Sequence, residues 1–245
     1  MIRAVVFDLD GTLIHTEELK AQSYAKAAVE IKPNAFSEQT AIEVFKTFVG
    51  RSREEVSKGL TDALDLEEAA HLLMSRYDVS EPWQVLTRLR IQIYDDMIAD
   101  TSTLRASAWK QNMDLLSQVR ATNCKLGLAT MSHCQHMLIV LKALELEGVF
   151  DFIATREDVV YPKPNPEIYD LAARALGVVP AEMMVIEDSV TGVRAGIAAG
   201  AAVLAVASAM TRESLHQADL LDQRYIINGP EELQEKLTGL IKDRG

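Results

Sequence analysis

The sequence predicts an α/β protein with a doubly wound, Rossmann-like parallel sheet and an inserted all-helical cap. Short apolar runs that end in polar or acidic residues recur along the chain, as expected for parallel strands covered on both faces. Between the first run and the others, helical periodicity extends over residues 16–99. We therefore expect a core domain of residues 1–15 and 100–245 and a cap domain of residues 16–99.

The first expected strand, Ala4 to Phe7, leads directly into Asp8, Asp10 and Gly11. Residues two apart in extended chain point to the same side, so the two aspartates can face one ligand. Adjacent carboxylates repel unless a cation or a shared proton intervenes. Mg²⁺ prefers oxygen ligands and would also supply positive charge for a phosphate. The alternative is a surface Asp-Gly turn in which Gly11 permits a tight bend.

The cap is expected to contain helices throughout. Apolar residues recur at helical spacing in two stretches: Ala41, Val44, Phe45 and Phe48, and Val85, Leu89, Ile93 and Met97. Ser52 with Glu55 forms a capping-box pattern, and Ser80 with Pro82 marks another helix start.

The alternation of strands and helices resumes after the cap. Further strands are expected at Lys125 to Thr130, Phe150 to Ala154, Met183 to Glu187 and Ala202 to Val206. Helical stretches between them favour a parallel sheet, whose ligands bind at the carboxyl ends of its strands. Asp8, Thr130 and the pair Glu187–Asp188 each follow or end a strand, so we expect them at one edge.

The acidic pair extends the candidate metal site. Glu187 and Asp188 end an apolar strand, where charged residues are rarely buried without a partner. Together with Asp8 and Asp10 they form the predicted ligand set for Mg²⁺. Taken alone, the pair has an alternative interpretation as helix N-terminal acids favoured by the helix dipole.

Two loops supply candidate phosphate-binding groups. Lys163 lies among prolines in a stiff loop, where its ammonium can bind a phosphate oxygen and reduce carboxylate repulsion. Thr130, Ser132 and His133 lie in the turn after a strand, where hydroxyl and backbone N–H groups suit a phosphate oxygen. The alternatives are a solvated lysine in a helix-initiating loop and a threonine that only caps a helix.

Composition excludes several classes of partner. Lysine and arginine total 25 against 36 acidic residues, and the net charge of −11 argues against nucleic acid or an anionic membrane. Cys124 and Cys134 are too few for a disulfide scaffold and are expected to be reduced. No window approaches the ~18 apolar residues of a membrane span, and aspartates interrupt the N-terminal apolar run. We expect a cytoplasmic protein, a monomer or a weak homodimer.

Four segments in order resemble the motifs of the haloacid dehalogenase superfamily of phosphohydrolases. These are Asp8-Leu9-Asp10-Gly11-Thr12, Thr130, Lys163-Pro164 and Glu187-Asp188. The resemblance is to the branch with a small helical cap after the first motif, which includes beta-phosphoglucomutase and phosphoglycolate phosphatase. It covers nearly the whole chain.

The resemblance implies a mechanism through a covalent aspartyl-phosphate. Asp8 would attack phosphorus, and Asp10 would protonate the leaving oxygen and later activate water. Thr130 and Lys163 would hold the transferring phosphoryl group. The second aspartate also separates phosphoryl transfer from dehalogenation, whose enzymes lack it.

The resemblance also implies a metal site and its ligands. Mg²⁺ would be held by Asp8, the backbone carbonyl of Asp10 and Asp188, with Glu187 supporting. The leading prediction is thus a Mg²⁺-dependent phosphatase that acts on a small phosphorylated metabolite, such as a sugar phosphate.

Substrate contacts in the cap follow from the same resemblance. The segment Val49-Gly50-Arg51-Ser52-Arg53 resembles one that contacts substrate in that branch, and Arg53 and Arg90 lie roughly where it places cationic contacts. A solvated helix face is the alternative. Lys20, a third candidate contact, stands where mutases use a histidine that couples cap closure to proton transfer. A charged lysine is a poorer switch, which favours a hydrolase.

Other functions remain as alternatives. A phosphomutase would keep its phosphoryl group on Asp8 until a bisphosphate intermediate reorients. Phosphonate hydrolysis would need a Schiff-base lysine, for which Lys20 or Lys58 could be proposed. From a different class, the chain could be a non-catalytic binding or regulatory protein on this fold, although every motif carboxylate is present.

Overall fold

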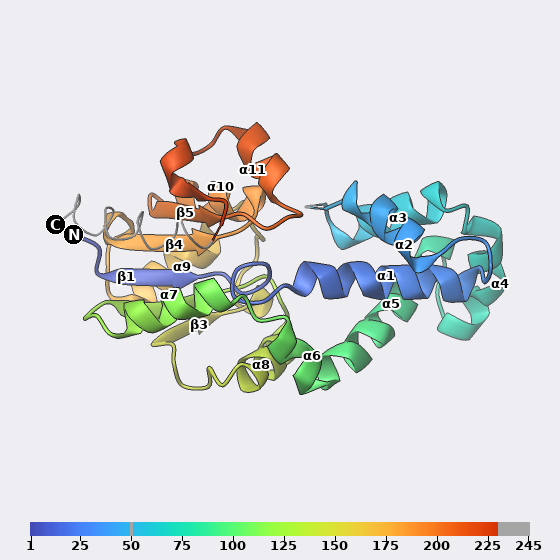
Figure 1. Cartoon of the computed structure of the whole chain (residues 1–245), viewed down its shortest axis with the longest axis horizontal. Helices are drawn as coiled ribbons and strands as arrows, with labels where there is room; N and C mark the ends of the chain where they lie inside the picture. Colours follow the sequence, from blue (N-terminus) through green and yellow to red (C-terminus); the bar gives the residue numbers. More distant parts are fainter. Residues whose placement is uncertain (50, 230–245) are drawn as a thin grey trace. The chain divides into compact units, whose positions relative to one another are not determined.

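The computed structural model describes residues 1–49 and 51–229, so Gly50 of the cap segment and residues 230–245 of the expected core domain lie outside the described residues. The fold divides into two compact units, Met1–His15 with Thr101–Gly245, and Thr16–Asp100. The strands of the described residues belong to the first unit, whereas the second unit is built from helices (Figure 1).

The first unit is organised around a parallel sheet. Its strands, as far as the described residues extend, are β1 Ala4–Phe7, β2 Lys125–Ala129, β3 Phe152–Ala154, β4 Met183–Glu187, β5 Ala202–Val206 and β6 Ile226–Ile227. Their order is β3-β2-β1-β4-β5-β6, and every neighbouring pair is parallel. The chain thus winds outward from β1 in both directions, and the predicted doubly wound α/β class is confirmed.

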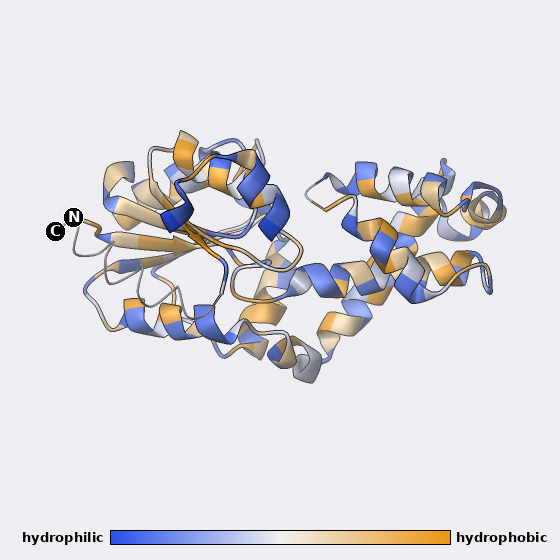
Figure 2. Cartoon of the chain, turned by 45° about the horizontal axis from the view of Figure 1, so that its top comes forward, coloured by the Kyte–Doolittle hydropathy of each residue, from blue (hydrophilic) through white to orange (hydrophobic). Residues whose placement is uncertain are grey.

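Helices cover both faces of this sheet. They are α6 Thr101–Ala106, α7 Lys110–Arg120, α8 Cys134–Ala143, α9 Glu167–Leu176, α10 Val190–Ala198 and α11 Arg212–Ala218, with the 3₁₀ turns η1 Arg156–Asp158, η2 Pro180–Glu182 and η3 Gln223–Tyr225. Right-handed crossovers place α7 and α8 on one face and α9, α10 and α11 on the other. Because both faces are covered, β1 and β4 are buried at every residue, and their residues are apolar except Glu187 at the end of β4. Figure 2 shows the largely hydrophobic colouring of the strands.

Two strand boundaries expected from the sequence are wrong, and one strand was not predicted. β3 begins at Phe152 and not at Phe150, although Asp151 already bonds Leu126 of β2 through both its backbone N–H and its carboxylate. β2 ends at Ala129 and not at Thr130, whose hydroxyl turns toward the first motif. The final strand, β6, is too short to produce a periodic pattern.

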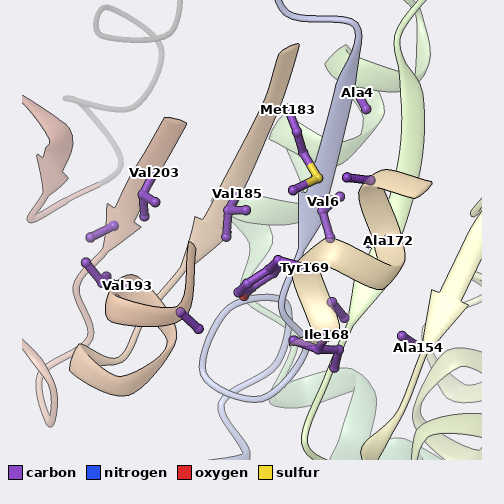
Figure 3. Packing of buried hydrophobic residues seen from close by; sticks show 14 of the residues in the cluster. Ala4, Val6, Ala154, Ile168, Tyr169, Ala172, Met183, Val185, Val193 and Val203 are labelled. Carbon is purple, nitrogen blue, oxygen red and sulfur yellow. The ribbon is translucent and has the colours of Figure 1, made fainter. Parts of the chain in front are cut away.

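A large apolar cluster lies on the face covered by α9, α10 and α11. Val6 of β1, Val185 of β4 and Val203 of β5 belong to it, and Ile168 and Tyr169 of α9 pack against these strands (Figure 3). Ile168 and Tyr169 are fully buried. This packing fixes the N-terminal turn of α9 against the sheet, and with it the end of the loop that carries the candidate lysine.

The second unit is the expected helical cap. Its helices are α1 Thr16–Ile31, α2 Glu38–Lys46, α3 Arg53–Ala63, α4 Glu67–Tyr77 and α5 Pro82–Ala99. The capping box of Ser52 and Glu55 at the start of α3 is confirmed. The helix start marked by Ser80 and Pro82 is also confirmed, since α5 begins at Pro82 with Glu81 as its N-cap. The Gln84 side chain accepts the backbone N–H groups of Ser80 and Glu81.

The structure also describes the two cysteines and the length and apolar character of the helices. Cys124 and Cys134 are free thiols, and Cys134 is exposed. Among the helices of the described residues, none combines the length and the apolar character that a membrane span requires.

We expect Ile168→Ala to lower the free energy of unfolding by about 2–5 kcal/mol, because it leaves a void in a closely packed interior. Urea denaturation measures this change. Leu72→Ala is the control, since the Leu72 side chain is 80% exposed, and it should change stability by less than about 0.5 kcal/mol. Equal stability of the two variants would contradict the packing of α9 described above.

Candidate active site

The carboxyl ends of β1, β2 and β4 meet at one edge of the sheet. β1 lies between β2 and β4, and Phe7 pairs with Leu128 on one side and Ile186 on the other. The backbone N–H of Asp8 donates to the Ile186 carbonyl at 2.9 Å, which extends the β1–β4 ladder by one residue. The side chains that follow these strands therefore share one small region, as the sequence predicts.

Lys163 joins the carboxylates of two different strands. Its Nζ donates to Asp8 Oδ1 at 2.7 Å, to Glu187 Oε1 at 2.7 Å and to the Ala129 carbonyl at 2.9 Å. All three donors of the ammonium are thus engaged. Burial alone would lower the pKa of Lys163, but Asp8 and Glu187 raise it well above its ordinary value, so the ammonium stays charged.

The loop before α9 is held by a residue that the sequence did not single out. Both carboxylate oxygens of Glu167 accept backbone N–H groups, from Val160 at 3.1 Å and Tyr161 at 2.8 Å. Those two bonds lower the pKa of Glu167, that from Tyr161 most. The Asn165 side chain in turn accepts the Glu167 backbone N–H at 3.0 Å. These bonds, together with the prolines, stiffen the loop that carries Lys163.

Glu187 is fully enclosed by donors. Its Oε1 accepts from Tyr169 Oη at 2.8 Å as well as from Lys163, and its Oε2 accepts from the backbone of Asp188 and from both the backbone and the hydroxyl of Ser189 at 3.0–3.2 Å. Gly192 makes room for this carboxylate, because a Cβ there would collide with it. Tyr169, Ser189 and Gly192 were not predicted as site residues, and the spacing from Lys163 to Tyr169 has no motif-like signal.

Asp10 is held by a second, separate group of donors. Its Oδ2 accepts from the hydroxyl of Thr130 at 3.1 Å and from that of Ser132 at 2.5 Å. The Thr130 hydroxyl also accepts the Ser132 backbone N–H at 3.0 Å, so the turn after β2 is closed on itself. Thr130 is not a helix cap, since α8 begins at Cys134 with His133 as its N-cap.

His133 lies beside this turn and is paired with Glu157 of η1. Its Nδ1 is 2.6 Å from Glu157 Oε1, and Glu157 Oε2 accepts the Cys134 backbone N–H at 3.1 Å. The hydrogen bond with His133 is the main cause that lowers the pKa of Glu157 to about 2. The sequence indicated His133 but gave no signal for Glu157, because the pairing depends on how η1 folds back.

Three carboxylates form a group that could hold a metal ion. Asp8, Glu187 and Asp188 are buried, and one oxygen from each lies within 4.8 Å of the others. Gly11, at a φ of 84°, lies so close to Asp188 that a Cβ would collide with its carboxylate. Burial raises the pKa of Asp8 to about 8; Lys163 opposes this, whereas repulsion from Glu187 and Asp10 adds to it. A hard divalent cation would relieve this excess of negative charge, so the donor set fits one.

The three candidate residues of the cap belong to the second unit. Lys20 of α1 donates to Glu17 at 2.7 Å. Arg90 of α5 is only 7% exposed, so the solvated helix face considered for it is wrong. Its guanidinium lies 4.8 Å from the ring centroid of Tyr24. Burial lowers the pKa of Arg53, and the positive charge of Arg90 adds to this effect, so the two cations are neighbours.

Comparison with known proteins agrees with this site. A family profile described as haloacid dehalogenase-like hydrolase matches residues 5–206. The phosphorylated carbohydrates phosphatase of Thermotoga maritima is 27% identical over 199 residues, which cover 81% of this chain and 82% of that protein. The pyrophosphatase PpaX of Bacillus pumilus is 29% identical over 206 residues, covering 84% and 83%. The crystal structure of beta-phosphoglucomutase from Clostridium difficile shares the fold, with a TM-score of 0.67 and 23% identity over 98% of this chain and 99% of that one.

The chain therefore belongs to the haloacid dehalogenase-like hydrolase family. The predicted family and the predicted enzyme class, a phosphohydrolase of that family, are confirmed. The relatives that it matches include a phosphatase of phosphorylated carbohydrates and a phosphoglycolate phosphatase.

We expect Tyr169→Phe to lower the free energy of unfolding by about 1–2 kcal/mol, because it removes one buried donor from the charged Glu187 while keeping the ring. Urea denaturation at neutral pH measures this loss. Tyr161→Phe removes the same hydroxyl from a side chain that is 62% exposed and serves as the matched control. If both variants were as stable as the wild type, the Tyr169 hydroxyl would contribute nothing to holding Glu187.

Proposed function

We propose that the chain is a Mg²⁺-dependent phosphatase that hydrolyses a small phosphorylated metabolite through a phosphoaspartate on Asp8. One observation carries this proposal: the Asp8 carboxylate at the sheet edge lies 2.7 Å from the Lys163 ammonium and forms a candidate cation site with Glu187 and Asp188. A carboxylate that attacks a phosphoryl group needs positive charge nearby, because both groups are negatively charged and repel each other. The surroundings of Asp8 offer that charge.

In the first step, an oxygen of Asp8 forms a bond to phosphorus as the bond between phosphorus and the leaving oxygen breaks. Asp10 gives its proton to the leaving oxygen, so that an alcohol rather than an alkoxide departs. Lys163 would hold an oxygen of the transferring phosphoryl group by redirecting the N–H that it donates to Asp8. The Thr130 hydroxyl would turn from Asp10 to another of these oxygens while Asp10 is protonated. The step leaves a phosphoaspartate on Asp8 and an ionised Asp10.

In the second step, Asp10 takes a proton from a water molecule, whose oxygen attacks the phosphorus. The bond between phosphorus and Asp8 breaks, inorganic phosphate leaves, and both aspartates return to their starting states. The hydroxyls of Thr130 and Ser132 support this exchange, because they can donate to Asp10 Oδ2 whenever it is ionised.

Asp8 and Asp188, with the backbone carbonyl of Asp10, are the groups we propose to hold Mg²⁺, and Glu187 supports them. Glu187 already accepts five hydrogen bonds, so it is better suited to anchoring Lys163 and the start of α10. When bound, Mg²⁺ supplies positive charge that offsets the negative charge of the phosphoryl group and of Asp8.

The state of Lys20 supports hydrolysis over a mutase reaction. Its ammonium donates to Glu17 within α1, so this lysine is engaged in an ion pair inside its own helix. Such a group is poorly suited to couple closure of a cap to proton transfer. Water would then be the acceptor of the phosphoryl group.

The substrate we propose is a sugar phosphate or a similar small metabolite with a second polar or anionic part. The relative from Thermotoga maritima is named a phosphatase of phosphorylated carbohydrates, which supports this class. Arg53 and Arg90 are neighbouring cations, and Arg90 Nε has no hydrogen-bond partner among the described residues. Two neighbouring positive charges favour binding of an anionic group by the partly exposed Arg53.

We expect Asp8→Asn to lower phosphate release by at least about 10³-fold while the fold is kept, because an amide is a poor nucleophile. Phosphate release is measured from sugar phosphates, phosphoglycolate, nucleotides and pyrophosphate, with Mg²⁺ or with EDTA. Asp114→Asn makes the same exchange at an exposed position of α7 and should keep full activity. Normal turnover by folded Asp8→Asn would exclude Asp8 as the nucleophile.

We expect Arg53→Ala to raise KM by roughly 10-fold with kcat nearly unchanged, because it removes a charged contact that the substrate makes before and during the reaction. Steady-state kinetics with the best substrate of the panel measures both constants. Arg53→Lys should recover part of the loss, and Arg88→Ala, at an exposed position of α5, controls for the change in net charge. An unchanged KM in Arg53→Ala for every good substrate would rule out this contact.

A further inference from the structure

The position of Asp10 depends on a tight turn that follows β1. The Leu9 carbonyl accepts the backbone N–H groups of Thr12, Leu13 and Ile14 at 2.9–3.3 Å, and the Gly11 N–H donates to the Ile14 carbonyl at 2.7 Å. These bonds lie within the turn itself. They leave the carbonyls of Thr12 and Leu13 to be satisfied by another element.

Helix α7 binds both of those carbonyls. Asn112 Nδ2 donates to the Thr12 carbonyl at 2.6 Å, and the Trp109 backbone N–H donates to the Leu13 carbonyl at 2.9 Å. Any residue type at position 109 except proline could make the second bond. The bond to the Thr12 carbonyl instead needs a side-chain donor of the length of asparagine at position 112. Thr12 and Asn112 are 100 positions apart in the sequence.

This asparagine is an unusual occupant of its position. Asn112 and Thr12 are both fully buried, and neither Asn112 Oδ1 nor Thr12 Oγ1 has a hydrogen-bond partner among the described residues. The other buried residues of α7 are Leu115, Leu116 and Val119, all of them apolar. A buried amide with an unsatisfied oxygen costs stability, so the bond from Asn112 Nδ2 to the Thr12 carbonyl is the contact that accounts for an asparagine here.

We propose that Asn112 is a positioning residue, which fixes the turn after β1 so that the Asp10 carboxyl is correctly placed for proton transfer. The inference rests on the proposed function, in which Asp10 is the general acid. Proton transfer requires hydrogen-bond reach between the acid and the leaving oxygen, so a small shift of the turn is costly. The Asp10 carboxylate is also bonded by the hydroxyls of Thr130 and Ser132, so the bond from Asn112 and these two bonds together restrict where the turn can lie.

The chemistry of the leaving group separates this role from a merely structural one. The alkoxide of a sugar is a strongly basic leaving group and needs a proton from Asp10 as it departs. A 4-nitrophenolate is a weak base and departs without one. Loss of correct acid placement therefore slows the phosphorylation step for a sugar phosphate and spares the same step for 4-nitrophenyl phosphate.

The test is Asn112→Leu, compared with the wild type in single turnovers with the enzyme in excess and Mg²⁺ present. We expect the release of alcohol from a sugar phosphate to slow by roughly 10-fold, and the release of 4-nitrophenolate to change by less than about 2-fold. The Tm should fall, because the buried Thr12 carbonyl is left without its donor. Val119→Ala, a cavity-forming change on the same helix, should lower Tm and leave both rates unchanged.

Wild-type rates with both substrates in Asn112→Leu would overturn the inference, and so would an equal slowing with both. If Asn112→Leu fails to fold, Asn112→Ala is measured in the same way, with the same ratio of rates expected. A wild type that releases no phosphate from any substrate would overturn the proposed function, and the inference with it. If the wild type turns over and Asn112→Leu shows the same rates with both substrates, the inference is overturned but the proposed function is not.

Discussion

Repulsion among buried carboxylates is the constraint on which the site depends. Asp8, Asp10, Glu187 and Asp188 all lie at one edge of the sheet, and three of them are less than a tenth exposed. Such a group is stable only if positive charge is brought to it. Lys163 supplies part of that charge by donating to Asp8 and Glu187, each at 2.7 Å. The stiff loop before α9, the packing of α9 on the sheet and the enclosure of Glu187 all keep that ammonium in place.

The two aspartates of the first motif are placed in different surroundings, which suits two different tasks. Asp8 contacts Lys163 and belongs to the candidate cation site, whereas Asp10 accepts hydrogen bonds from the hydroxyls of Thr130 and Ser132. Positive charge beside Asp8 favours its ionised form, which attacks phosphorus. A neutral hydroxyl can donate a hydrogen bond to the ionised form of Asp10 or accept one from its protonated form. Asp10 can therefore give a proton and later take one.

The sequence predicted the fold and the acidic centre of the site because both follow from local patterns. Apolar runs mark buried parallel strands, and the polar residues that follow them must meet at the carboxyl edge. The sequence did not predict the contacts that helices make with that edge. Tyr169 and Asn112 each touch the site from a helix, and nothing in their spacing reveals it. The burial of Arg90 was missed for the same reason, since it depends on packing among cap helices.

The central claim is that Asp8 carries the phosphoryl group. The most direct measurement is to mix the Mg²⁺-loaded enzyme with substrate, quench with acid within the first turnovers, and map the modified peptide by mass spectrometry. We expect one added phosphoryl group on the peptide that contains Asp8, removable by hydroxylamine as an acyl phosphate is. A phosphoryl group on another residue, or turnover with no modified peptide at any quench time, would contradict covalent catalysis by Asp8.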